Sequence, residues 1–168
     1  MRTFVASVIA VIVLVLADPS ISATLVSQWK LDETSGTATA DSSGNGHTGT
    51  LRSAAGMTWE PSGGMDIGCI YFNNTNTNSG ITVPSTGMTA TAGTITLWGK
   101  LADPQPARLR YFIKVQGGNS STCISFSMDS GDNNLDITLG SKISDKATLN
   151  TGEWYHLAIA YSGSTTKT

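Results

Sequence analysis

The sequence predicts an all-β domain, built as a sandwich of antiparallel sheets. Short runs of β-branched and aromatic residues recur along the chain, with turn-forming residues between them. The 168 residues include 18 glycines, which favour tight turns, and no stretch carries the sustained apolar spacing of a helix. The length suits a single domain once a leader has been removed.

The start of the chain is typical of a secretory signal peptide. Arg2 supplies a positive charge, residues 4–17 form an uncharged apolar run, and Pro19 ends that run. Ala23 offers the small residue that precedes a cleavage site, and cleavage after Ala17 is an alternative. We expect the cut after Ala23, because it leaves the next strand-like segment intact.

The chain is therefore divided into a signal-peptide helix, residues 1–23, and a mature domain, residues 24–168. The apolar run is shorter than the roughly 20 residues of a membrane-spanning helix. An uncleaved anchor or a buried core helix is the alternative. Export predicts a secreted or cell-surface protein with no stable membrane span after the leader is removed.

Several segments of the mature chain have the composition of strands. In residues 25–31, Leu25, Trp29 and Leu31 alternate with polar residues, which predicts a half-buried strand. In residues 93–101, Trp98 is out of phase with the apolar positions and faces the other side of the sheet. The remaining expected strands are 68–72, 81–83, 111–115, 123–128, 135–139 and 154–161.

The charge pattern argues against a nucleic-acid partner. The formal net charge is −2, and charged residues make up 13% of the chain. Phosphate binding needs a basic stripe or patch, and the sequence contains none. We therefore expect no nucleic-acid binding.

Four stretches in a fixed order resemble the laminin-G-like, concanavalin A-like jelly roll of many secreted bacterial proteins. The resemblance covers residues 25–168 and implies a lectin- or glucanase-like β-sandwich. The stretches are Trp29–Glu33 with the turn Asp41–Gly46, then Gly68–Phe72, Gly93–Trp98 and Gly152–Ala158.

Two departures from the family pattern lead to further expectations. Gly99 replaces a larger residue, which predicts a weakened strand or a bulge. Family members continue beyond the position of Thr168 into further strands, so we expect a domain incomplete at its C-terminal end. Residues 25–31 would then lack a neighbouring strand.

The turn Asp41–Gly46 is a candidate calcium site. Asp41 and Asn45 offer side-chain oxygens on a glycine-rich loop, which suits Ca²⁺, and many jelly rolls of this kind hold calcium near such a loop. The alternative is an Asx-stabilised turn without an ion. A second acidic cluster, expected to be a solvated hairpin tip, comprises Asp129, Asp132, Asn133 and Asp136.

Cys69 and Cys123 are the two cysteines of the chain. Export permits a disulfide between them, and each lies on the strand face opposite its apolar neighbours. Matching faces do not establish proximity. A disulfide and a pair of free thiols therefore both remain open.

Candidate catalytic groups are sparse, which predicts a protein that is not an enzyme. Asp32 and Glu33 are adjacent and point to opposite faces of a strand, so they cannot form the paired carboxylates of a glycosidase. No metal-binding pair or nucleophile motif accompanies His47 or His156. His156 follows the family's Trp-x-His pattern and is expected to be structural.

Trp98 is the candidate ligand contact, because sugar rings stack on exposed aromatic faces. Packing inside the sandwich is the alternative for this side chain. We expect a non-catalytic recognition domain for carbohydrate or extracellular protein, with calcium as a candidate cofactor. The alternatives are a structural or adhesive spacer without a ligand, and a glycoside hydrolase or its accessory domain.

Overall fold

The computed structural model describes residues 24–73, 79–86, 92–102, 110–116, 123–128 and 133–162. Within these ranges every helix or strand assigned is a β-strand, and all strand pairs are antiparallel. The signal-peptide prediction lies outside the described residues. No helix in the described part of the chain has the length and apolar character needed to cross a membrane.

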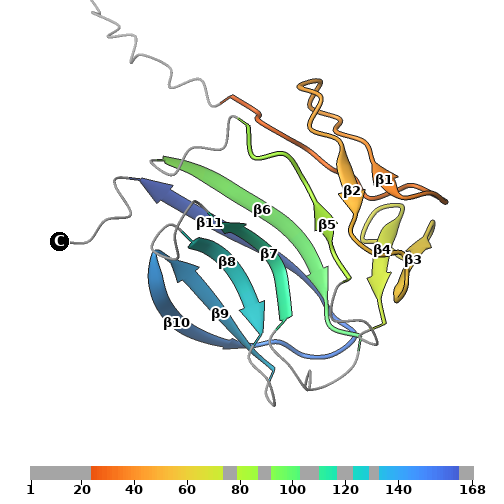
Figure 1. Cartoon of the computed structure of the whole chain (residues 1–168). Coiled ribbons are helices and arrows are strands. Elements are labelled where there is room, and N and C mark those ends of the chain that lie inside the picture. Colours follow the sequence, from red (N-terminus) through yellow and green to blue (C-terminus); the bar gives the residue numbers. More distant parts are fainter. Residues whose placement is uncertain are drawn as a thin grey trace, which may run out of the picture.

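Two sheets form the main body of the sandwich (Figure 1). One is four-stranded, in the order β10-β9-β8-β7, and the other pairs β11 with β6. In the second sheet the register is unbroken from Trp154 opposite Lys100 to Ser162 opposite Ala92. The strands are β6 (Ala92–Lys100), β7 (Arg110–Gln116), β8 (Cys123–Met128), β9 (Asn134–Leu139), β10 (Ser141–Thr148) and β11 (Trp154–Ser162).

The hydrophobic core lies between these two sheets. Ile124, Phe126 and Met128 alternate along β8, and each is at most 3% exposed. Leu157 and Ile159 of β11 join the same cluster, together with partly buried residues of β6. The two-residue period of a strand places these apolar side chains on one face, and their burial drives the sheets together.

Gly99 does not form a bulge, which was one of the two alternatives predicted for this position. Gly99 is buried and stays in register opposite Tyr155. A Cβ at this position would lie 2.7 Å from Cε1 of Phe112 in β7. The missing side chain therefore makes room for an aromatic ring of the facing sheet.

The N-terminal part of the described chain forms shorter strands, which lie beyond β6 in Figure 1. One small sheet has the order β1-β2-β5, and a second consists of β3 and β4. The bounds are β1 (Ala38–Thr39), β2 (Gly49–Leu51), β3 (Met57–Glu60), β4 (Cys69–Phe72) and β5 (Ile81–Thr82).

The predicted all-β sandwich is confirmed, whereas the strand expected at residues 25–31 is wrong. Trp29 makes an isolated bridge with Asp41, and the rest of the segment belongs to no strand. Leu25, expected on the buried face, is 57% exposed. Leu31 has a φ of 58°, which ends any extended conformation there.

Candidate functional site

The outer face of the β6–β11 sheet carries the most exposed tryptophan of the described structure, Trp98. Ile95 and Leu97 point toward the core, so Trp98 projects to the opposite side, where it is 51% exposed. This confirms the side predicted from the alternation. His156 lies directly opposite on β11, with ring centroids 5.0 Å apart and ring planes inclined by 41°.

An aromatic–cation pair follows on the same face. Lys100 is two residues beyond Trp98, and its partner in the register is Trp154. The Lys100 Nζ lies 4.9 Å from the centroid of the Trp154 ring. A cation–π contact of this kind holds the ammonium group in place while leaving it in contact with water.

We call these four residues, Trp98, Lys100, Trp154 and His156, the aromatic–cation face. Continuing along both strands, the outward positions of this sheet are small and exposed, and none of those described is a carboxylate. They are Thr94, Thr96, Ala158 and Ala160. Small neighbours leave the Trp98 ring accessible to a flat ligand.

The Asp41 loop is held by hydrogen bonds of its own. Asp41 Oδ1 accepts bonds from the N–H groups of Gln28 and Ser43, at 3.0 and 2.9 Å, and Oδ2 accepts one from the N–H of His47 at 2.9 Å. Bonds from the Ser43 hydroxyl first, and then from the backbone N–H groups, hold the pKa of the Asp41 carboxyl well below its usual range, although burial acts in the opposite direction.

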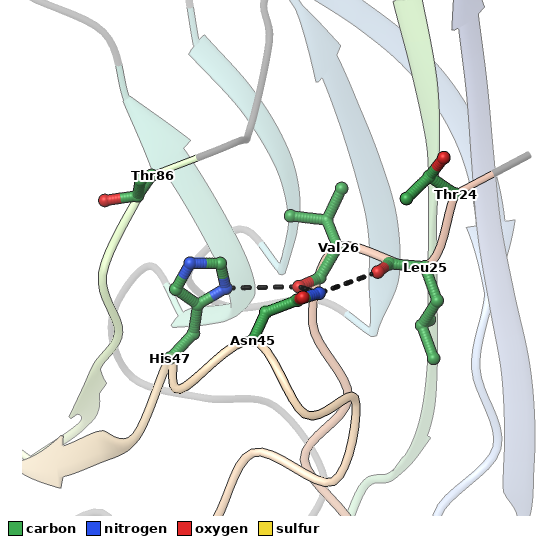
Figure 2. A pocket seen from close by; sticks show the side chains of 6 residues that line it. All are labelled: Thr24, Leu25, Val26, Asn45, His47 and Thr86. Carbon is green, nitrogen blue, oxygen red and sulfur yellow. Dashed lines mark hydrogen bonds between the residues drawn. The ribbon is translucent and has the colours of Figure 1, made fainter.

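Asn45 and His47 face the N-terminal segment across a depression of about 420 Å³ (Figure 2). The Asn45 side-chain amide donates to the carbonyls of Leu25 and Val26, both at 2.9 Å. His47 Nδ1 lies 3.1 Å from the Val26 carbonyl oxygen. Side chains of the loop thus satisfy backbone groups that a neighbouring strand would otherwise satisfy.

This arrangement corresponds to the Asx-stabilised turn rather than to a formed calcium site. Asp41 uses both oxygens on N–H donors, and Asn45 presents its amide nitrogen to two carbonyls. Ca²⁺ needs six to eight oxygen ligands. Among the described residues, no three His, Cys, Asp or Glu side chains lie together in a way that could hold a metal ion. In this conformation the two side chains do not fit the ion, and calcium binding stays a prediction.

The cysteine prediction also stays open. Cys69 lies in β4, where burial raises the pKa of its thiol, while Lys100 acts in the opposite direction and Glu60 in the same one. Cys123 begins β8, and its side chain is outside the described part of the structure. The pairing of the two residues is therefore untested.

The second acidic cluster lies only partly within the described structure. Asp129 and Asp132 lie outside the described residues. Asp136, expected at a solvated tip, instead lies within β9, opposite Ser127, and is 2% exposed. Asp136 therefore belongs to the strand predicted at residues 135–139, and the expectation of a solvated position was wrong because its side chain is buried beside β8.

Two of the described carboxylates, Glu33 and Glu153, take part in local hydrogen bonds. Glu33 Oε1 accepts a hydrogen bond from the Ala40 N–H at 2.7 Å, which gives this side chain a structural contact. Glu153 Oε2 accepts bonds from the Tyr155 hydroxyl and the Asn150 amide, and these two bonds lower its pKa. Each of these two carboxylates therefore stabilises a turn next to it.

The fold defines a β-sandwich of the jelly-roll class, and a comparison with protein families identifies it further. A laminin-G-like family model, described as the concanavalin A-like lectin/glucanases superfamily, matches residues 74–168. This chain belongs to that family, which confirms the resemblance. No curated protein and no solved structure matches the chain in the corresponding comparisons.

The sequence singled out Trp98 and did not single out the other three residues of the aromatic–cation face. His156 was expected to be structural, and Trp154 had no assigned role. Their place on the face depends on the register between β6 and β11, which joins residues far apart in the sequence. The sequence does contain a pattern that predicts their side of the sheet. Trp154 and His156 are at even-numbered positions of the strand and the apolar residues Leu157 and Ile159 at odd-numbered ones, so the two pairs point to opposite faces.

Proposed function

We propose that this protein is a non-catalytic recognition domain of a secreted or cell-surface protein, and that it binds carbohydrate through the outer face of the β6–β11 sheet. Family membership supports carbohydrate or protein binding in general and an extracellular setting. The observation that carries the carbohydrate assignment is the half-exposed Trp98 ring beside His156.

Trp98 is not isolated on this face, because His156 contacts it and the Lys100–Trp154 pair follows along the strands. Apolar surface rimmed by polar groups is typical of a binding site. The apolar face of a pyranose ring covers such a side chain, while the sugar hydroxyls stay in water or bond to nearby polar groups. Catalysis is not part of the proposal, because the described carboxylates Glu33 and Glu153 serve backbone and turn contacts.

A glycan array tests the proposal with the secreted chain, a Trp98→Ala variant and a Tyr111→Ala variant. Tyr111 is a matched control because it is an aromatic residue of the other sheet and is 44% exposed. We expect sugar binding by the wild type and by Tyr111→Ala, and a loss of about tenfold in affinity for Trp98→Ala. Absence of sugar binding, or equal binding by all three proteins, would favour a spacer or a protein ligand.

A further inference from the structure

Trp98 has a cationic neighbour whose position is fixed by the strand. Lys100 projects from the same face two residues further on, and two residues of a strand span about 6.6 Å. Its Nζ is positioned by the Trp154 ring at 4.9 Å. The backbone positions that carry the aromatic platform and the lysine are therefore about one sugar ring apart.

We propose that the aromatic–cation face selects polysaccharides of uronic acids, with the ring stacked on Trp98 and its carboxylate paired with Lys100. This inference rests on the proposed function, because it names the ligand class of the same face. The described outward positions of β6 and β11 include no Asp or Glu, so a carboxylate entering here meets no like charge from these strands.

The charge on the face matches a uronate better than a sulfated chain. Lys100 is the single lysine or arginine among the described outward positions of the two strands, and the net charge of the whole chain is −2. A polymer with several sulfates on each repeat requires a dense basic patch. One ammonium beside one stacking platform suits one carboxylate on each ring.

The contact between Lys100 and Trp154 also reduces the entropic cost of binding. A free lysine side chain loses rotamer freedom when it pairs with a ligand. Here the cation–π contact already restricts the side chain before the ligand arrives. The carboxylate then completes an arrangement that is largely formed.

The second Lys–aromatic pair of the described structure provides a matched control. Lys114 Nζ lies 5.0 Å from the centroid of the Tyr111 ring on β7. The chemistry of this pair is the same, but it belongs to the other sheet. Lys114→Gln therefore removes an equivalent charge without changing the aromatic–cation face.

The test is a titration of the whole chain with oligogalacturonate and with the same oligosaccharide after reduction of its carboxyl groups. We expect the wild type to prefer the acidic form about fivefold, the upper range for an exposed ion pair, and added salt to remove the preference. Lys100→Gln should abolish the preference, whereas Lys100→Arg and Lys114→Gln should retain it. Thermal melts confirm that each variant is folded.

Equal affinity for the acidic and reduced forms would overturn the uronate inference and leave the proposed carbohydrate function intact. A preference that survives in Lys100→Gln, or tighter binding of a sulfated chain such as heparin, would also overturn it. Failure to bind either oligosaccharide would overturn it as well, and the glycan array decides separately whether the proposed function fails.

Discussion

The two parts of the described chain are stabilised in different ways. From β6 to β11, two sheets enclose a shared apolar core, and the buried hydrophobic side chains of the described chain all lie between Ile124 and Ile159. From Thr24 to Thr86 the strands are two to four residues long. There, the side chains of Asp41, Asn45 and His47 bond to backbone groups of other segments.

This difference indicates which part determines the fold. Apolar burial in the β6–β11 region is cooperative, because each core residue contacts several others. A network of side-chain-to-backbone bonds can open locally at a smaller cost. We therefore expect substitutions in the core to unfold the domain and substitutions in the Asp41 loop to act locally.

The largest expected effect is that of Phe126→Ala. Phe126 is 1% exposed at the centre of the core, and removal of a buried Phe side chain costs about 3–5 kcal/mol. Urea unfolding of the variant measures this loss. Phe72→Ala is the control, because Phe72 is 44% exposed in β4 and should cost about 1 kcal/mol or less. Equal losses would contradict the comparison between the two regions.

A smaller loss is expected when a methyl group is added at Gly99. The Cβ of Gly99→Ala would meet the Phe112 ring, and overpacking of this kind costs about 1–3 kcal/mol. Phe112→Leu in the same chain should recover part of the loss, which a double-mutant cycle in urea measures. A Gly99→Ala variant as stable as the wild type would show that the ring does not need this space.

The acid sensitivity of the Asp41 loop is a third prediction. The pKa of Asp41 is lower in the folded protein than its unfolded value of about 3.9. Its contribution to stability is therefore complete above that pH and is lost as the pH falls toward the folded pKa. Asp41→Asn should weaken this acid dependence.

The Trp29 indole N–H reports on the same loop, because it donates to the His47 carbonyl at 2.7 Å. In the wild type its NMR signal should shift as the pH falls below about 4, before the core signals change. Glu153→Gln is the control, since Glu153 belongs to the β11 region and has a lowered pKa of its own. Simultaneous loss of the Trp29 and core signals would contradict local opening.

The smallest expected effect is that of removing calcium. Because Asp41 and Asn45 already bond to protein groups, we expect thermal melts with and without a chelator to coincide. A fall of several degrees in the chelator, abolished by Asp41→Ala, would instead establish the calcium site predicted from the sequence. Magnesium added at the same ionic strength separates a specific ion from general screening.

Local patterns in the sequence predicted much of the β6–β11 region and less of the rest. The alternation around Ile95 and the run at residues 154–161 identified two strands correctly, because in each strand one face is apolar and the other is more polar. The strand Ser141–Thr148 was not predicted, since its residues are mostly polar and its pairing with β9 is broken by an irregularity. Residues 57–60 were also not among the predicted strands, and they form β3.

The strand predicted at residues 25–31 shows why alternation is insufficient. Leu25 and Trp29 have the required spacing, but a strand also needs a neighbouring backbone that continues the ladder. Here Asp41 and Asn45 supply the hydrogen bonds from their side chains. No local sequence pattern predicts that side chains will take the place of a neighbouring strand in this way. The pairing between Trp98 and His156 across the sheet is likewise not predictable from a local pattern.

We infer that the β6–β11 face, rather than the Asp41 loop, binds the ligand. Titration of the ¹⁵N-labelled chain with oligogalacturonate, followed by NMR, tests it most directly. We predict shifts in the Trp98 indole and in the amides of residues 96–100 and 154–158, with no change at residues 41–47. Shifts confined to Asn45, His47 and residues 24–26 would contradict the claim and place the ligand in the depression beside the Asp41 loop.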